Sequence, residues 1–158
     1  LKSDAPEDVA VHLLWQLERA GYAVNAGPNP ADVVVALRDR VHTLKEMADK
    51  AKVWYQPLQV EDYDQQAIAK QLTATVRVPF ELFIAKLTML NEWTLTNVHQ
   101  AFADTLTELS LTMGKIGPAV RVAITGSTVS PSIDHTVFLC GKQQALARLN
   151  TALSQLPQ

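Results

Sequence analysis

Hydrophobic residues recur every three or four positions along most of the chain, which is the spacing of amphipathic α-helices. Near the start they are four apart, at Val9, Leu13 and Leu17. A longer series in the second half keeps the same rhythm and comprises Leu95, Val98, Phe102, Leu106, Leu109 and Met113. The pattern predicts an all-α protein.

Residues that begin helices divide the first part of this pattern into segments. Asn29 before Pro30 is typical of an N-cap followed by a first helical position. Thr43 with Glu46 forms a capping box, which predicts a fresh helix there. Arg40 therefore falls at the corner between two helices.

Four further helices are expected in the middle and at the end of the chain, from apolar spacing and from start and stop residues. They are one over roughly 62–72, one opening at Pro79, one from a cap at Thr94 to a stop at Gly114, and one over 142–156.

A linker is expected at residues 55–64, which contain a proline and three acidic residues. We therefore predict two small helical subdomains, residues 1–60 and residues 61–158.

The stretch RVAITGSTVSPS, residues 121–132, fits two structures. Alternating valine and isoleucine residues are typical of a strand, but a lone strand leaves its backbone groups without partners. Two pairs of helix start and stop signals outweigh the alternation: Pro118 with Gly126, and Ser130-Pro131 with Gly141. We therefore predict a helix, a loop at 126–130, and a second helix.

Composition narrows the class of protein. Hydrophobic residues make up 47% of the chain, enough for a sizeable core, and no apolar run approaches the roughly 18 residues of a membrane span. Cys140 is the only cysteine, which excludes an internal disulfide and indicates a cytoplasmic protein with a buried thiol. The polar start without methionine leads us to expect a fragment of a longer protein.

Catalytic and metal-binding motifs are absent from the sequence. Around Gly141-Lys142 the P-loop pattern fails at both flanking positions, and no dinucleotide-binding glycine motif or serine nucleophile elbow occurs. The four histidines have no partner at metal-ligand spacing. Trp15, Trp54 and Trp93 are expected to pack in the core. We predict neither a catalytic residue nor a metal site.

Charge is distributed unevenly. Residues 1–114 carry a net formal charge of -5, and residues 115–158 carry a net formal charge of +3. The basic end permits an anionic partner, whereas the acidic part fits an alternative, a helical protein–protein interaction module. Arg40 and Arg121 carry planar donor sets suited to base edges. On the residues alone, however, a surface ion pair is the favoured explanation for each, for example Arg40 with Asp39 or Glu46.

Several longer stretches resemble one known family. RDRVHTLKEMADKA at 38–51, EWTLTNVHQAF at 92–102 and GPAVRVAITGSTVSPSIDHTVFLCGK at 117–142 are similar to the C-terminal, anticodon-binding part of bacterial glutamyl-tRNA synthetase, a class I aminoacyl-tRNA synthetase. The resemblance covers essentially the whole chain.

This resemblance implies a helical cage of two subdomains that grips the anticodon loop of glutamate tRNA. The whole enzyme is a glutamate–tRNA ligase that uses ATP and Mg²⁺ in a Rossmann-type catalytic domain, whose signatures do not occur here. The resemblance therefore implies no catalysis and no cofactor in this chain. Its expected partners are glutamate tRNA and its own catalytic domain, in a cytoplasmic monomer.

The resemblance also implies roles for individual residues. Arg40 holds the place of an arginine that reads the third anticodon base and thereby separates glutamate from glutamine tRNA, since relatives with glutamine there accept both. Arg121 matches a residue that contacts the first base, and Ser130, Pro131 and Ile133 match the stretch around the middle base.

Two positions depart from the family pattern. Some relatives have an aromatic residue where this chain has Asp134, which removes a stacking contact. Others have glutamine at Pro118, which has no side-chain donor.

Overall fold

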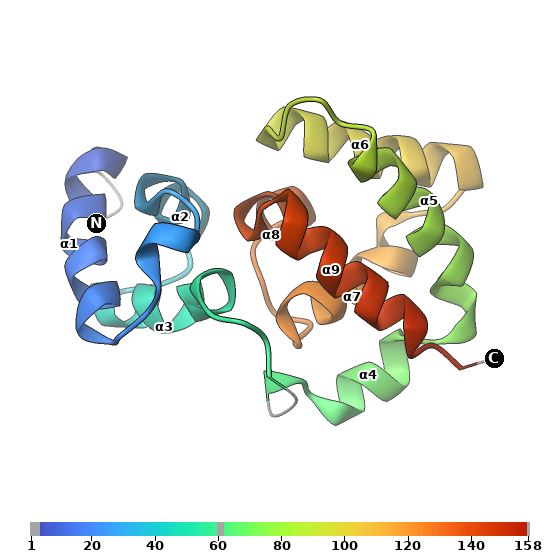
Figure 1. Ribbon diagram of the computed structural model, residues 1–158, viewed down its shortest axis with the longest axis horizontal. Helices are drawn as coiled ribbons and strands as arrows, with labels where there is room; N and C mark the ends of the chain where they lie inside the picture. Colours follow the sequence, from blue (N-terminus) through green and yellow to red (C-terminus); the bar gives the residue numbers. More distant parts are fainter. Residues whose placement is uncertain (1–3, 60–61, 158) are drawn as a thin grey trace. The chain divides into compact units, whose positions relative to one another are not determined.

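The computed structural model describes residues 4–59 and 62–157. Within these ranges the chain forms nine α-helices and no strand, which confirms the predicted all-α class (Figure 1). Internal contacts divide it into two compact units, Leu1–Pro57 and Leu58–Gln158. That residues 1–60 and 61–158 are subdomains of one cage stays a prediction.

The first unit consists of three mutually packed helices and a short 3-10 helix, Val24–Ala26. The three are α1 (Pro6–Arg19), α2 (Pro30–Leu37) and α3 (Leu44–Tyr55). Their apolar faces meet as the spacing predicts, with a core that includes Val9, Leu13, Leu17, Val33, Leu37, Met47 and Trp54.

Both predicted helix starts in this unit are confirmed. The Asn29 side chain accepts a hydrogen bond from the Ala31 amide at 3.0 Å. Thr43 accepts one from the Glu46 amide at 3.0 Å, and the Glu46 carboxylate accepts one from the His42 amide at 3.2 Å. These bonds satisfy amides that a helix start leaves without intrahelical partners.

The second unit holds the remaining helices around a core that includes Phe80, Phe83, Leu87, Phe102, Ile124, Leu139 and Leu149. They are α4 (Gln65–Gln71), a 3-10 turn (Ala74–Val76), α5 (Arg77–Thr88), α6 (Leu95–Leu109), α7 (Met113–Thr125), α8 (Ile133–Cys140) and α9 (Lys142–Ser154). α7 packs against α4, α8 and α9 (Figure 1).

Two helix starts in this unit differ from prediction by a few residues. α4 begins at Gln65 rather than near residue 62, because Asp64 accepts hydrogen bonds from the amides of Gln66 and Ala67. α5 begins at Arg77, two residues before Pro79.

The predicted helix end at Gly114 is wrong. α6 ends at Leu109, and Ser110 takes the left-handed conformation with φ 53°. The Leu111 amide then donates to the Leu106 carbonyl at 2.9 Å, which closes the helix end. The hydrophobic series therefore spans two helices, and Met113 opens α7.

Pro118 lies inside α7 and does not begin it as predicted. Ile116, Val120 and Ala123 form one buried face that runs across the proline, so packing holds the helix where an amide is missing. The predicted end at Gly126 is confirmed by its φ of 82°.

The loop after α7 is longer than predicted. Ser130-Pro131 does not begin the next helix, because α8 starts at Ile133 with Ser132 as its N-cap residue. The predicted end at Gly141 is confirmed by its φ of 80°. We call residues 126–132 the α7–α8 loop.

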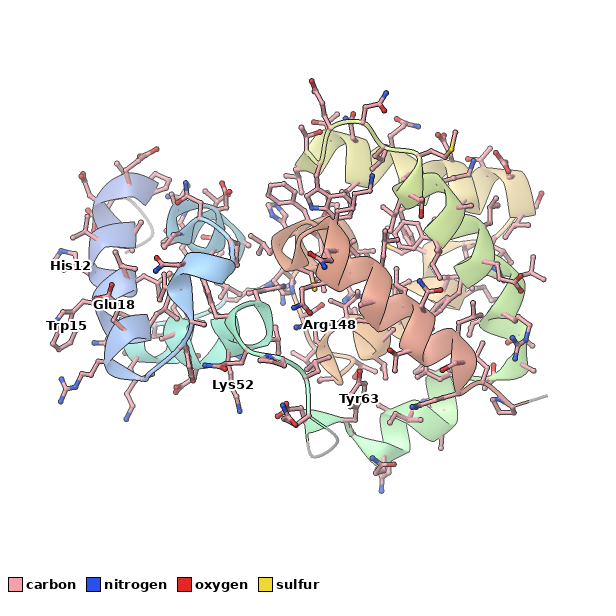
Figure 2. The ribbon with its side chains drawn as sticks, viewed as in Figure 1. His12, Trp15, Glu18, Lys52, Tyr63 and Arg148 are labelled. Atoms are coloured by element: carbon pink, nitrogen blue, oxygen red, sulfur yellow. The ribbon has the colours of Figure 1, made fainter. Side chains whose placement is uncertain are left out.

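The three tryptophans have different environments. Trp54 is a core residue as predicted, only 5% exposed. Trp15 is 54% exposed and points away from α2 and α3, so its predicted core role is wrong (Figure 2). Trp93 is half-buried and donates to the Phe138 carbonyl at 2.9 Å.

Candidate nucleic-acid interface

Arg121 joins α7 to the α7–α8 loop. It lies one turn before the end of α7. Its Nε donates to Ser130 Oγ at 3.1 Å, and Nε and Nη2 approach the Pro131 carbonyl oxygen at 3.4 and 3.5 Å. Three predicted site residues are thus in direct contact.

A buried hydroxyl completes this cluster. Thr136, on α8, is 0% exposed, and its Oγ1 donates to the Pro131 carbonyl oxygen at 3.0 Å. The same Oγ1 lies 2.9 Å from Ser130 Oγ, which itself donates to the Pro131 carbonyl oxygen at 2.9 Å. We call Arg121, Ser130, Pro131 and Thr136 the loop cluster.

The side chains of Pro131 and Ile133 face the protein. Both residues are buried, and Ile133 is 2% exposed. A Cβ placed on Gly117 of α7 would lie 3.7 Å from Ile133 Cδ1, an ordinary van der Waals distance, so Ile133 packs against α7 at this glycine. These residues support the loop, whose surface includes Val129 at 70% exposed.

The α7–α8 loop is also held at its start. The Asp64 amide donates to the Gly126 carbonyl oxygen at 2.8 Å. A Cβ on Gly126 would lie 2.5 Å from the Asp62 carbonyl oxygen, so the two backbones touch at a distance that only glycine allows. Residues 62–64 and the loop are therefore fastened to each other.

Arg148 supports the same region from α9. It is 7% exposed, and its Nη1 donates to the Ile124 carbonyl oxygen at 2.8 Å, in the last turn of α7. Tyr63 is close enough to feel its charge: burial raises the pKa of the Tyr63 hydroxyl, and Arg148 offsets part of that rise (Figure 2). A buried guanidinium thus fixes the helix end that carries the loop.

Asp134 is occupied by protein partners. Its carboxylate accepts hydrogen bonds from the Ser132 hydroxyl and the His135 amide, and it lies 3.3 Å from His99 Nδ1. Burial by itself raises the pKa of Asp134, but the two hydrogen bonds and the neighbouring histidines outweigh it and lower the pKa. Asp134 therefore stabilises the start of α8, next to its N-cap.

Arg40 belongs to the first unit, where it lies exposed between α2 and α3. Its amide donates to the Leu37 carbonyl oxygen at 2.8 Å, which fixes the backbone of the corner. Among residues 4–59 and 62–157, no hydrogen bond or ion pair engages its side chain. The predicted alternative, an ion pair with Glu46, is not formed.

Other kinds of site find no support in the described part of the chain. Its histidines, cysteine and acidic residues form no group of three that could hold a metal ion. Burial raises the pKa of the Cys140 thiol to about 11, so this cysteine is an unreactive core residue. No described helix has the length and apolar character needed to cross a bilayer.

Residues 9–153 match a family described as the anticodon binding domain. The chain belongs to this family.

Known relatives of this anticodon-binding domain are glutamate–tRNA ligases. Those of Xanthomonas campestris pv. campestris and Stenotrophomonas maltophilia are 49% and 47% identical over 156 residues, which is 99% of this chain. The chain spans only 33% of the length of each relative.

Solved structures show the same fold. The glutamate tRNA ligase of Elizabethkingia meningosepticum matches 99% of this chain and 30% of its own, with a TM-score of 0.83 at 15% identity. The glutamate-tRNA synthetase of Elizabethkingia anophelis matches 98% of this chain and 30% of its own, with a TM-score of 0.79 at 17% identity.

Two residues that support the α7–α8 loop were not predicted from the sequence: Thr136 on α8 and Arg148 on α9. Both occupy positions with helical core spacing: Thr136 falls between Ile133 and Val137 on the buried face of α8, and Arg148 lies beside Leu149. A polar side chain at a core position must find a partner. A polar residue at a core position was therefore the sequence feature that could have identified Thr136 and Arg148.

Proposed function

We propose that this anticodon-binding domain recognises the anticodon loop of glutamate tRNA as part of a glutamate–tRNA ligase. The observation that carries the proposal is the loop cluster, in which Arg121 on α7 holds Ser130 of the loop beside the start of α8. The names of the relatives supply the identity of the tRNA.

The loop cluster suits contact with unstacked bases. A guanidinium has five N–H donors, so Arg121 can brace the loop and also contact a base edge. We assign Arg121 to the first anticodon base, and the loop around Ser130 and Pro131 to the middle base. Ile133 is buried, so its role is to hold the loop in shape from below.

Arg40 is assigned to the third anticodon base, where glutamate and glutamine tRNAs differ. Its exposed side chain has no competing partner among the described residues. Its neighbour Arg38 instead donates to the Asp4 carbonyl oxygen at 3.2 Å. Two arginines at one corner therefore have separate tasks, one structural and one for recognition.

The longer ligase supplies the chemistry in this proposal. Since the chain spans 33% of its relatives, ATP and Mg²⁺ belong to the part outside it. The ligase acts as a cytoplasmic monomer in which this domain presents the anticodon.

Replacement of Arg40 by glutamine in the full-length ligase tests the assignment. A good base contact is worth about 1–3 kcal/mol of discrimination, so the preference for glutamate over glutamine tRNA should fall about 5- to 150-fold. The measurement is the ratio of kcat/KM for charging the two tRNAs.

Arg38→Gln is the matched control, because it removes the same charge from the same corner. It should leave the ratio unchanged. An unchanged ratio in Arg40→Gln would remove Arg40 from recognition, and a domain that shifts no tRNA in a gel would favour the protein–protein interaction module instead.

A further inference from the structure

The loop cluster contains two hydroxyl groups with different exposure. Thr136 is 0% exposed, whereas Ser130 is half-buried at the surface of the α7–α8 loop. Each hydroxyl has one proton to donate and can also accept. Where these two protons point decides what the loop can offer to a ligand.

The proton of Thr136 has to be given within the protein. Its acceptors in the cluster are the Pro131 carbonyl oxygen at 3.0 Å and Ser130 Oγ at 2.9 Å. When Thr136 donates to the carbonyl, that buried acceptor is satisfied. Ser130 Oγ accepts the Nε proton of Arg121 at 3.1 Å and donates its own proton to the same carbonyl at 2.9 Å. Because Thr136 also donates to that carbonyl, the Ser130 proton can leave it for a ligand without stranding a buried acceptor.

We propose that Thr136 is a positioning residue for recognition: it satisfies the Pro131 carbonyl and thereby allows Ser130 to donate its proton to an RNA base. The inference rests on the function proposed above. The base atom must be an acceptor, a carbonyl oxygen or an unprotonated ring nitrogen, because the Ser130 oxygen already accepts from Arg121.

Loss of the Thr136 hydroxyl should therefore remove the hydrogen bond from Ser130 to the base while the Ser130 side chain stays in place. The Pro131 carbonyl would keep only the long Arg121 contacts, at 3.4 and 3.5 Å, and the Ser130 hydrogen bond at 2.9 Å. Because a buried acceptor without a good donor is unfavourable, the Ser130 hydroxyl would have to stay on that carbonyl. The base would then meet an oxygen with no proton to donate.

The test is equilibrium binding of the 158-residue chain to a glutamate tRNA transcript at one low salt concentration. Thr136→Val keeps the shape and removes the hydroxyl, and it should weaken binding about 3- to 10-fold, the range for one neutral hydrogen bond. Ser130→Ala should weaken it equally. The double variant should be no weaker than either single variant, and Thr136→Ser should restore binding.

Thr105→Val is the matched control. Thr105 is also 0% exposed and donates to the Ala101 carbonyl oxygen at 2.8 Å, within α6. It should bind RNA like the parent chain. Thermal unfolding of all variants separates loss of folding from loss of binding.

The outcomes are distinguishable. A parent chain that does not bind the tRNA refutes the proposed function and this inference with it. Parental binding with undiminished affinity in Thr136→Val overturns only the inference. So does an additive loss in the double variant, or an equal loss in Thr136→Ser, since either would mean that Thr136 acts through packing rather than through Ser130.

Discussion

Gly126→Ala should be one of the most destabilising single changes in the second unit. Gly126 ends α7 with φ 82°, and residues 62–64 pass directly over it. An added methyl group would lie 2.5 Å from the Asp62 carbonyl oxygen and 3.1 Å from Tyr63 Cα. Both neighbours are backbone, so no flexible side chain can move aside.

The expected loss follows from two separate effects. An L-residue in the left-handed region costs about 1–2 kcal/mol. The displaced segment must also stretch the 2.8 Å bond from the Asp64 amide to the Gly126 carbonyl, whose loss costs about 1 kcal/mol. Together the two effects cost about 2–3 kcal/mol.

Gly21→Ala isolates the first of these effects. Gly21 has a φ of 84° after α1, and nothing lies within 4 Å of the methyl group it would gain. The free energy of unfolding of the first unit should therefore fall by about 1–2 kcal/mol in Gly21→Ala. Urea denaturation followed by circular dichroism measures both losses, each from the transition of its own unit, with the m-value as a check that the states compared are the same. Equal losses in the two variants would mean that residues 62–64 do not press on Gly126 in solution.

Two further predictions concern pH. Tyr55 donates to the Pro28 carbonyl oxygen at 2.8 Å, so Tyr55→Phe should lower the free energy of unfolding by about 1 kcal/mol at neutral pH. Because burial and Asp32 raise the pKa of Tyr55, the stability of the parent chain in urea should fall above about pH 10. If Tyr55→Phe showed the same fall, another group would be its cause. The pKa of Asp134 is lowered, so Asp134 should stabilise the fold above about pH 4, and this stabilisation should be lost as the pH falls further. Asp134→Asn should therefore make stability less dependent on pH in the acid range. An unchanged dependence would exclude Asp134 as its source.

Helix starts were predictable where a side chain caps the helix. Asn29 and Thr43 each accept a bond from an amide two or three residues ahead, and that chemistry is visible in the sequence. Ser130-Pro131 has the same appearance, but its hydroxyl is held by Arg121 and Thr136. Tertiary partners competed for the cap, and short-range patterns contain no information about them.

The site was predictable to a similar depth. Resemblance selected Arg121, Ser130 and Pro131, and the structure places all three in contact. The resemblance could not show that the Ile133 side chain faces the protein interior. Thr136 was missed because its contribution depends on α8 folding back onto the end of α7, which no local pattern describes.

Pro118 has a consequence for how α7 opens. It has no amide proton to donate to the Gly114 carbonyl, so one backbone hydrogen bond is absent between the first turn and the rest of the helix. Beyond it, Gly126 and Arg148 fasten the other end. Fraying that begins at Met113 therefore meets a boundary at the proline, so the first turn can exchange its amide hydrogens with solvent while the turn that carries Arg121 stays closed.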